Sequence, residues 1–302
     1  MADIEATYRS IVQCINEQRW DDLPRYMHSH FAKDGQDCTP ESYAAEMKAI
    51  GDVELSVDAL TVDHDASQQR LAATLLVKRK PAPSDETGAE FTGRAVSFME
   101  QQFNWFTDGK LSKTLTLADR DEIQRQLVDP AASYTPDLIT SLDQHQPPPP
   151  QPSASSHGKQ LSTRELEDTY RAYIACINAQ TMESCLPSFC HAQVIHNTKA
   201  LTLDGYRLMI QEAFTAIPDL SFGLHTVVAD ERTQRVAARL EFAGTPEGEL
   251  AGAAPTPTAG DGRRRAVAFC EHVTYRFDHG RIARVWSIID WPTYRAQLAE
   301  QR

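Results

Sequence analysis

The sequence contains no long hydrophobic run. None of its apolar stretches approaches the ~20 residues that a membrane-spanning helix needs. The first six residues, MADIEA, are acidic and lack the basic start and the apolar core of a secretion signal. We therefore expect no membrane partner and a cytoplasmic protein.

Positive charge is also scarce. The 302 residues include 30 Lys and Arg against 42 Asp and Glu, which gives a net charge of −12. A nucleic-acid surface needs clustered basic side chains to contact phosphates. The one basic run, residues 263–265, reads as the solvated edge of a strand. A nucleic-acid partner is therefore not expected.

The motifs of metal and cofactor sites are missing. The six cysteines form no CxxC pair, and His191, His196 and His272 fall on separate predicted elements without ligand spacing. No glycine-rich phosphate-binding loop occurs. We expect no metal and no cofactor. In a cytosolic setting we expect reduced thiols, with Cys14 and Cys176 as small core residues.

What the sequence does contain is a repeat. Residues 8–16, YRSIVQCIN, are echoed by residues 170–178, YRAYIACIN, and residues 109–119 are echoed by residues 280–290. A repeat of about 165 residues is the size of a whole domain rather than of a solenoid unit. The chain is therefore expected to hold two copies of one domain.

A segment rich in proline and serine separates the copies. It contains QPPPPQP followed by SASS. Consecutive prolines favour an extended spacer, and the serines favour flexibility. We predict an N-terminal domain over residues 1–128, a linker over residues 129–160 and a C-terminal domain over residues 161–302.

The same order of elements is predicted in both copies. Apolar residues at helical spacing predict a first helix, a short second helix is expected after it, and Thr39 and Thr202 are plausible caps of a third. Alternating apolar residues then predict an antiparallel sheet and a closing helix. The predicted ranges are 3–18, 23–28, 53–62, 69–79, 93–107, 110–119 and 120–127 in the first copy, and 165–179, 186–191, 220–229, 234–243, 264–277, 281–290 and 291–299 in the second.

This order predicts an α+β fold. Asp108-Gly109 and His279-Gly280 are turn pairs that join the last two strands of each copy as a hairpin. Three helices should cover one face of a curved sheet that curls around a pocket, which gives two cone-shaped domains. The other face of each sheet needs a cover. We therefore predict that the copies pack as an intramolecular pseudo-dimer, in a monomeric chain or a weak homodimer.

A series of short motifs in the second half carries a family resemblance. They are Pro218-Asp219, RVAAR at 235–239, Gly244-Thr245, Tyr275, GRI at 280–282, Trp286 and Asp290. In order and spacing they resemble the SnoaL-like polyketide cyclase family of the NTF2-like superfamily, over roughly residues 165–300. An insertion at 257–261 departs from the family pattern. The first half has Thr74 and Leu115 in place of the Arg and the Trp, so its site is expected to be degenerate.

The resemblance implies an NTF2-like pocket, free of metal and cofactor, for a small apolar or polyoxygenated organic substrate. Relatives perform general acid–base chemistry on polyketide-like or terpenoid-like intermediates of secondary metabolism, as cyclases, isomerases or dehydratases. Others open epoxides, so an epoxide hydrolase or an epoxide-opening cyclase is an alternative. Fold alone does not decide function, and a non-catalytic ligand-binding or scaffolding module is a further alternative.

Asp290 is the leading catalytic candidate. Strand alternation puts it on the same side as Ile288 and Trp286, which should be the pocket side. An apolar environment would raise its pKa and suit it to proton transfer, and the resemblance puts the family's catalytic carboxylate at this position. The alternative is that Asp290 caps the closing helix, because Trp291-Pro292 follows directly.

Three further residues complete the predicted catalytic set. His196 has a near-neutral ordinary pKa and could protonate or orient a substrate oxygen. Arg239 needs a carboxylate partner if buried, and with two carboxylates it would resemble NTF2-like epoxide hydrolases; the alternative is a structural ion pair. Glu271 lies in an apolar stripe, where a carboxylate must be paired or used.

The remaining predicted site residues bind substrate or belong to the first copy. The predicted substrate-binding residues are Trp286, Tyr275, Glu241, Asn197, Tyr206 and Phe214. Glu100 and Asp119 are the counterparts of Glu271 and Asp290, and the sequence leaves open whether the pocket that they would form is active. Trp286, Arg239 and His196 occur only in the second copy, so the chemistry is expected there.

Overall fold

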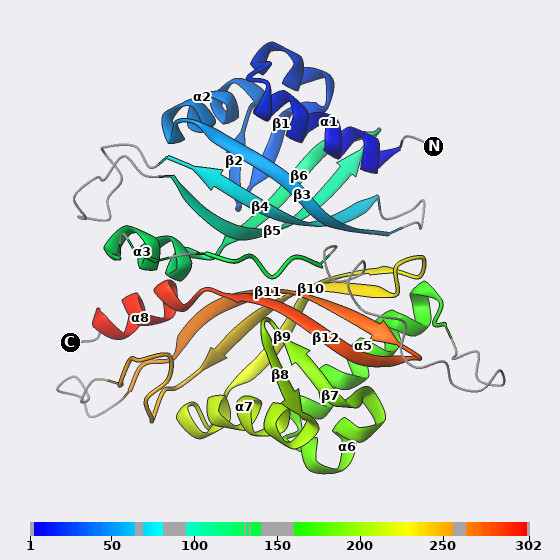
Figure 1. The fold of residues 1–302 in the computed structure, drawn as a ribbon, viewed down its shortest axis with the longest axis vertical. Helices are drawn as coiled ribbons and strands as arrows, with labels where there is room; N and C mark the ends of the chain where they lie inside the picture. Colours follow the sequence, from blue (N-terminus) through cyan, green and yellow to red (C-terminus); the bar gives the residue numbers. More distant parts are fainter. Residues whose placement is uncertain are drawn as a thin grey trace. The chain divides into compact units, whose positions relative to one another are not determined.

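The structure is a computed structural model, and it describes residues 3–63, 69–80, 95–129, 131–132, 134–139, 160–255 and 264–300. The chain divides into two compact units, residues 1–147 and 148–302 (Figure 1). The predicted strand start at 93–94, the linker residues 140–159 and the insertion at 257–261 lie outside the described residues.

Both units contain the same elements in the same order. The first has α1 (Ile4–Asn16), the 3₁₀ helix η1 (Trp20–Arg25), β1 (Met27–Lys33), β2 (Gln36–Cys38), α2 (Pro40–Ile50), β3 (Val53–Val62), β4 (Arg70–Arg79), β5 (Val96–Thr107), β6 (Lys110–Ala118) and α3 (Arg120–Val128). The second has α5 (Thr163–Asn178), α6 (Met182–Phe189), β7 (Cys190–His196), β8 (Lys199–Thr202), α7 (Leu203–Ala216), β9 (Ser221–Asp230), β10 (Arg235–Gly244), β11 (Val267–Asp278), β12 (Arg281–Ile289) and α8 (Trp291–Ala299). The predicted α+β class and the duplication are confirmed.

Side-chain caps fix where the helices begin. The Thr39 hydroxyl accepts a hydrogen bond from the Ser42 amide at the start of α2, and Thr202 accepts one from Gly205 at the start of α7. Ser162 and Glu165 form a reciprocal capping box at the start of α5. Each cap satisfies amide groups that have no partner within the helix, so both predicted Thr caps are confirmed.

The sheets differ from the prediction in size and direction. Each has six strands, in the orders β2-β1-β6-β5-β4-β3 and β8-β7-β12-β11-β10-β9. The expected four antiparallel strands are present in each sheet, and two short strands add to them. β1 and β7 pair in parallel with β6 and β12, and β2 and β8 pair antiparallel with β1 and β7. The predicted second helices at 23–28 and 186–191 are wrong at their ends, since His28 and His191 already lie in strands.

The hairpin turns follow their sequence signal. Asp108 and Gly109 have φ of 50° and 75°, and His279 and Gly280 have φ of 49° and 76°. Two consecutive positive φ values match the right-handed twist of the paired strands. The turns set the register in which β5 pairs with β6 and β11 with β12.

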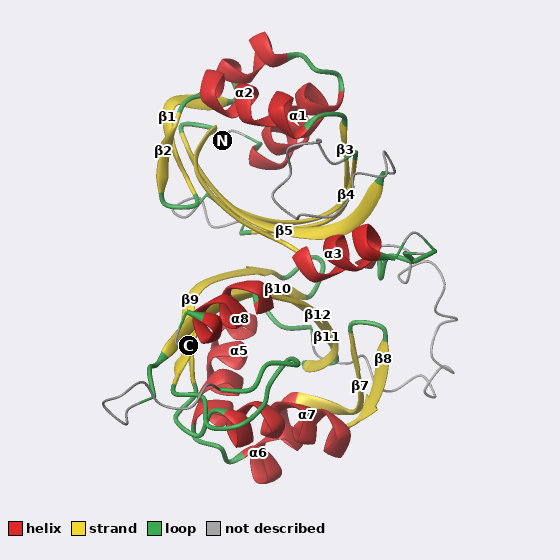
Figure 2. Ribbon diagram, turned by 90° about the vertical axis from the view of Figure 1, so that its left-hand side faces the viewer, coloured by secondary structure: helices red, strands yellow, loops and turns green. Residues whose placement is uncertain are grey.

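Each sheet is curved, and helices cover its concave face (Figures 1 and 2). In the first unit α1 and α2 lie over this face, and in the second α5, α6 and α7 do so. A hydrophobic core fills the space between helices and sheet in each unit. Side chains on one face of β5 or β11 therefore point toward the helices, and the alternate side chains point away.

Two details of the chain concern cysteine and the linker. Cys176 of α5 and Cys185 of α6 form a disulfide, with Cα atoms 6.4 Å apart. The expectation of reduced thiols is wrong for this pair, because spatial proximity rather than a CxxC spacing brings the sulfurs together.

The Ile139 amide donates to Asp58 Oδ2 at 2.6 Å, so the described end of the predicted linker is anchored on β3. Among the described residues, no helix is long and apolar enough to cross a membrane.

Candidate functional site

The first unit contains a cavity of about 270 Å³ between its helices and the concave face of its sheet. Its wall is largely apolar, with contributions from Tyr8, Ile11, Val12, Met47, Phe98 and Leu111. Polar side chains on β5 and near the start of α2 interrupt this wall. A mostly apolar pocket with a few converging polar groups is the usual form of a small-molecule site.

Glu100 is a carboxyl group on the β5 wall of this cavity. It lies on β5 on the same face as Phe98 and Gln102. The Gln102 amide donates to Glu100 Oε1 at 2.6 Å, and the Tyr8 hydroxyl donates to Gln102 Oε1 at 2.8 Å. Burial raises the pKa of Glu100, and the hydrogen bond from Gln102 offsets this only in part.

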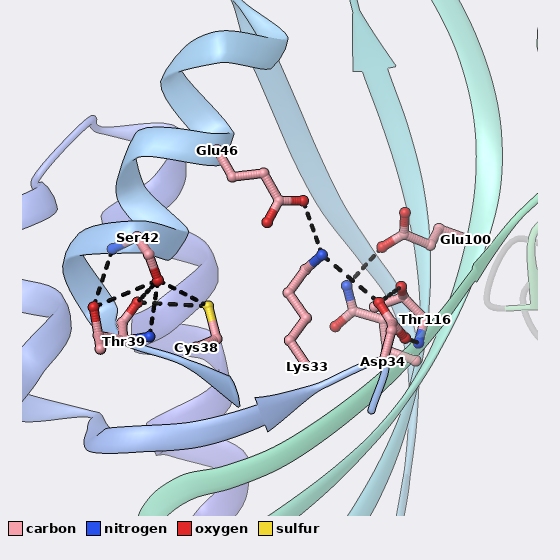
Figure 3. A network of polar contacts seen from close by, with 9 residues as sticks. Lys33, Asp34, Cys38, Thr39, Ser42, Glu46, Glu100 and Thr116 are labelled. Atoms are coloured by element: carbon pink, nitrogen blue, oxygen red, sulfur yellow. Dashed lines mark hydrogen bonds and ion pairs between the residues drawn. The ribbon is translucent and has the colours of Figure 1, made fainter. Parts of the chain in front are cut away.

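The cavity wall also carries an ion pair between Lys33 and Glu46. Lys33 Nζ lies 2.8 Å from Glu46 Oε1 on α2 and 3.6 Å from Asp34 Oδ2 (Figure 3). Burial alone would lower the pKa of Lys33, but the hydrogen bond to Glu46 and the nearby carboxylates outweigh it and raise this pKa. Lys33 therefore brings a stable positive charge to a cavity that also holds Glu100.

The interior of the second unit carries tyrosines at several matching positions. Tyr173 stands where the first unit has Ile11, and Tyr275 stands where it has Asn104, as the strand and helix registers show. The Tyr173 and Tyr206 hydroxyls are 2.6 Å apart, and the ring of Tyr275 lies 5.8 Å from that of Tyr173. These rings are buried.

Glu271 is the carboxyl group of this second interior. It is 7% exposed, and the Ser287 hydroxyl donates a hydrogen bond to it. Burial raises the pKa of Glu271 to about 7, against the smaller opposing effect of Ser287. The structure thus brings predicted Glu271, Tyr206 and Tyr275 to one side of the sheet, with Phe214 in the same core.

His196 and Asn197 lie where β7 ends. Burial and the charge of Lys199 lower the pKa of His196 to about 4, and its ring lies 6.1 Å from that of Tyr206. A neutral imidazole at this point can orient a polar group, but it holds no proton to spare near neutral pH. Asn197 exchanges hydrogen bonds with the Ser287 backbone and so joins the β7–β8 turn to β12.

Asp290 is the cap of α8. Its Oδ1 accepts a hydrogen bond from the Thr293 amide at 3.3 Å, as Asp119 Oδ1 does from Glu122 at 3.0 Å in the first unit. Trp286 stacks on Arg284 at 4.8 Å and is absent from the core cluster that contains the intervening Val285. The structure therefore puts Trp286 on the convex face of β12, away from Glu271.

Arg239 and Glu241 also lie on the convex face. Arg239 Nη1 donates to His272 Nε2 at 2.8 Å, and its Nε lies 3.7 Å from a Glu241 oxygen. Glu271 neighbours His272 along β11 and points to the opposite face. The predicted arrangement that would resemble an epoxide hydrolase combines Arg239 and Asp290 with Glu241 or Glu271. Glu271 is turned away from Arg239, whereas Glu241 lies beside it, so the version with Asp290 and Glu241 stays a prediction.

Several residues of the first cavity were not predicted as site residues. They are Tyr8, Lys33, Tyr43, Gln102 and Asn104, and all of them line it. The repeat gave a signal for two of the cavity residues. Tyr8 belongs to the repeated first helix, and Glu100 is the first-copy counterpart of Glu271. The polar residues Gln102 and Asn104, two and four positions after Glu100, gave a signal, because an alternating polar stripe on a strand that faces helices indicates a lined pocket.

Two mixed sheets of this topology, each covered by helices, define a duplicated α+β protein with a pocket between the helices and the sheet of its first unit. Residues 167–298 match the model of a family described as SnoaL-like polyketide cyclase. A SnoaL-like polyketide cyclase from Agrobacterium tumefaciens str. C58 is 38% identical to this chain; the match covers 46% of this chain and 99% of that one, with a TM-score of 0.39. TsrD from Streptomyces laurentii is 21% identical, over 46% of this chain and 97% of that one, with a TM-score of 0.39.

No curated protein matches the chain. The identity of 38% extends over nearly the whole Agrobacterium protein, and the family match covers most of the second unit. The chain belongs to the SnoaL-like polyketide cyclase family.

Proposed function

We propose that this chain is a general acid–base enzyme of secondary metabolism that cyclises, isomerises or dehydrates a small polyketide-like or terpenoid-like intermediate in the cavity of its first unit. The observation that carries the proposal is Glu100, a carboxyl group with a raised pKa on the wall of an apolar cavity of about 270 Å³. A desolvated carboxylate is a stronger base than one in water, and proton transfer is most effective when the pKa lies near the working pH.

The proposed chemistry begins at a carbon beside a substrate carbonyl. Glu100 removes a proton from this carbon, and the electron pair moves to the carbonyl oxygen to give an enolate. Lys33 lines the same cavity and would stabilise the negative oxygen. In a cyclisation the enolate carbon attacks a second carbonyl, whose oxygen takes the proton from Glu100. In an isomerisation Glu100 returns the proton to another carbon of the conjugated enolate. In a dehydration the hydroxyl group on the carbon next to the enolate carbon leaves and takes the proton from Glu100 to become water.

This proposal puts the chemistry in the first unit, whereas the sequence favoured the second. Two observations support the change. Asp290 serves as a helix cap, and Arg239 and Trp286 lie on the convex face of their sheet. A scaffolding protein with both interiors filled is not favoured by the open cavity beside Glu100.

The test is hydrogen exchange at the acidic C–H of 2-tetralone, a bicyclic ketone suited to a cavity of this size. The protein in D₂O should speed deuterium uptake, followed by mass spectrometry, and Glu100→Gln should lower the enzymatic rate by roughly 10²–10⁴-fold. The rate should rise with pH through a pKa above the ordinary 4.5, because only the carboxylate is the base. Exchange that survives Glu100→Gln unchanged would contradict the proposal.

A second candidate is the same chemistry at Glu271 in the second unit. Its favouring observation is the pKa of about 7, which suits an acid–base group at neutral pH. Tyr206 and Tyr275 would then orient the substrate. The match to the family model, over residues 167–298, also favours this unit. Glu271→Gln in the same exchange assay separates the two candidates.

A further inference from the structure

Asn104 is a buried amide on the wall of the first cavity. It lies on β5, on the same face as Glu100 and Gln102, and it is 1% exposed. Among the residues that the structure describes, neither Oδ1 nor Nδ2 has a hydrogen-bond partner. A carboxamide has one acceptor and two donors to satisfy, and buried polar groups of folded proteins are nearly always paired.

The amide is not a requirement of the fold. The matching position of the second unit is Tyr275, whose ring packs against Tyr170 and Tyr173. The same topology is therefore compatible with a ring at this position. In the first unit the smaller Asn104 lines the cavity, and no group in the described part of the chain pairs with its amide edge. An unpaired buried amide facing an open cavity indicates a partner that arrives from outside.

We propose that Asn104 determines which ligand the first cavity accepts, by pairing with a planar group that carries a hydrogen-bond donor and an acceptor side by side, as a carboxamide or a lactam does. Such a group forms two hydrogen bonds with the amide edge of Asn104. The proposal rests on the proposed function, because it concerns the same cavity.

The spacing along β5 fixes which end of the ligand is recognised. Asn104 is four residues from Glu100, which on a strand is roughly 13 Å. A ligand of two fused rings can extend from one to the other within a cavity of about 270 Å³. Asn104 therefore binds the end of the molecule remote from the carbon that Glu100 deprotonates, and it acts as a specificity residue rather than as a catalytic residue.

The test uses three naphthalene probes that differ only in their polar group. 2-Naphthamide offers a donor and an acceptor, 2-acetonaphthone offers an acceptor, and 2-methylnaphthalene offers neither. Binding to the full chain is measured by calorimetry or by probe fluorescence. We expect 2-naphthamide to bind about tenfold or more tightly than 2-methylnaphthalene, with 2-acetonaphthone between them. The hydrogen bonds that the probe loses to water are replaced at Asn104, and they also satisfy a buried amide that is unpaired without the probe.

Asn104→Leu should remove this preference, so that all three probes bind with similar affinity. Because the amide has no partner to lose, the melting temperature of the variant should equal or exceed that of the wild type. Asn104→Met is the second variant, since its flexible side chain adapts to the same space if Leu disturbs folding. Equal affinities in the wild type, or a preference retained in both variants, would overturn the proposal.

Glu100→Gln distinguishes this proposal from the proposed reaction. It should keep the preference for 2-naphthamide while it loses exchange of 2-tetralone. A protein that prefers 2-naphthamide through Asn104 but shows no exchange dependent on Glu100 would contradict the catalytic proposal alone. Exchange that depends on Glu100 without any preference among the probes would contradict the role of Asn104 alone.

Discussion

At the scale of single residues, Glu100 and Glu271 show how neighbouring groups affect the pKa of a carboxyl group. Glu100 and Glu271 occupy the same position of the repeated sheet. Glu100 accepts from the Gln102 amide and faces a cavity, whereas Glu271 accepts from the Ser287 hydroxyl and lies among tyrosines. Desolvation is the largest cause of the raised pKa in both, so both should disfavour the charged form in the folded protein.

This desolvation predicts how stability depends on pH. Between about pH 4.5 and pH 7 the unfolded chain ionises Glu271 while the folded chain keeps it protonated, so folding stability falls as pH rises through this window. The loss is on the order of 3 kcal/mol once both states are ionised. Gln cannot ionise, so the Glu271→Gln variant does not lose this stability. The unfolding free energy of the variant minus that of the wild type should therefore be larger at pH 8 than at pH 5. Urea unfolding at the two pH values checks this, and an equal difference at both would contradict it.

Part of the residue-level geometry could be predicted from the sequence. Glu271, Tyr206 and Tyr275 were predicted in the pocket, and the structure brings them to one side of the second sheet. Trp286 was assigned to the wrong face. On β12 both faces carry large apolar side chains, with Val285 on one and Trp286 on the other, so alternation alone could not show which face the helices cover.

At the scale of elements, Asp290 belongs to a helix start. The carboxylate accepts from the Thr293 amide, so it satisfies one of the free amides of α8. Asp290→Ala should cost about 1 kcal/mol of unfolding free energy, while Asp290→Asn should keep the cap and cost only a few tenths. Thermal or urea unfolding measures both, and Asp119→Ala at the start of α3 is the matched control.

The same variants decide between capping and catalysis. We expect Asp290→Asn to exchange 2-tetralone at the wild-type rate, because Asn keeps the cap and the proton carrier is elsewhere. A loss of exchange in a variant of unchanged stability would restore Asp290 as the catalytic carboxylate that the family resemblance implies.

Local sequence signals predicted most of the helices and strands. The strands that were not predicted have weak local signals. Helix caps and the turn pairs Asp108-Gly109 and His279-Gly280 predicted where helices start and hairpins turn. β1, with sequence MHSHFAK, has no β-branched residue and pairs in parallel with the distant β6. β1 forms because it pairs with β6 and packs against α2. These contacts join segments that are distant in the sequence, so the local sequence does not reveal them.

At the scale of the whole molecule, the repeat predicted two domains but not the difference between their interiors. The difference comes from side-chain volume at matching positions, such as Ile11 against Tyr173 and Asn104 against Tyr275. These replacements change the side-chain volume around the space between the helices and the sheet. The packing of the two copies as a pseudo-dimer stays a prediction.

The most direct measurement compares Glu100→Gln with Glu271→Gln in the full chain, by the rate of deuterium uptake into 2-tetralone at one pH. The two variants make the same chemical change at matching positions of the repeat. We expect Glu271→Gln to stay within about twofold of the wild type and Glu100→Gln to lose about 10²-fold or more. The opposite pattern would contradict the assignment to the first unit and place the proton carrier at Glu271.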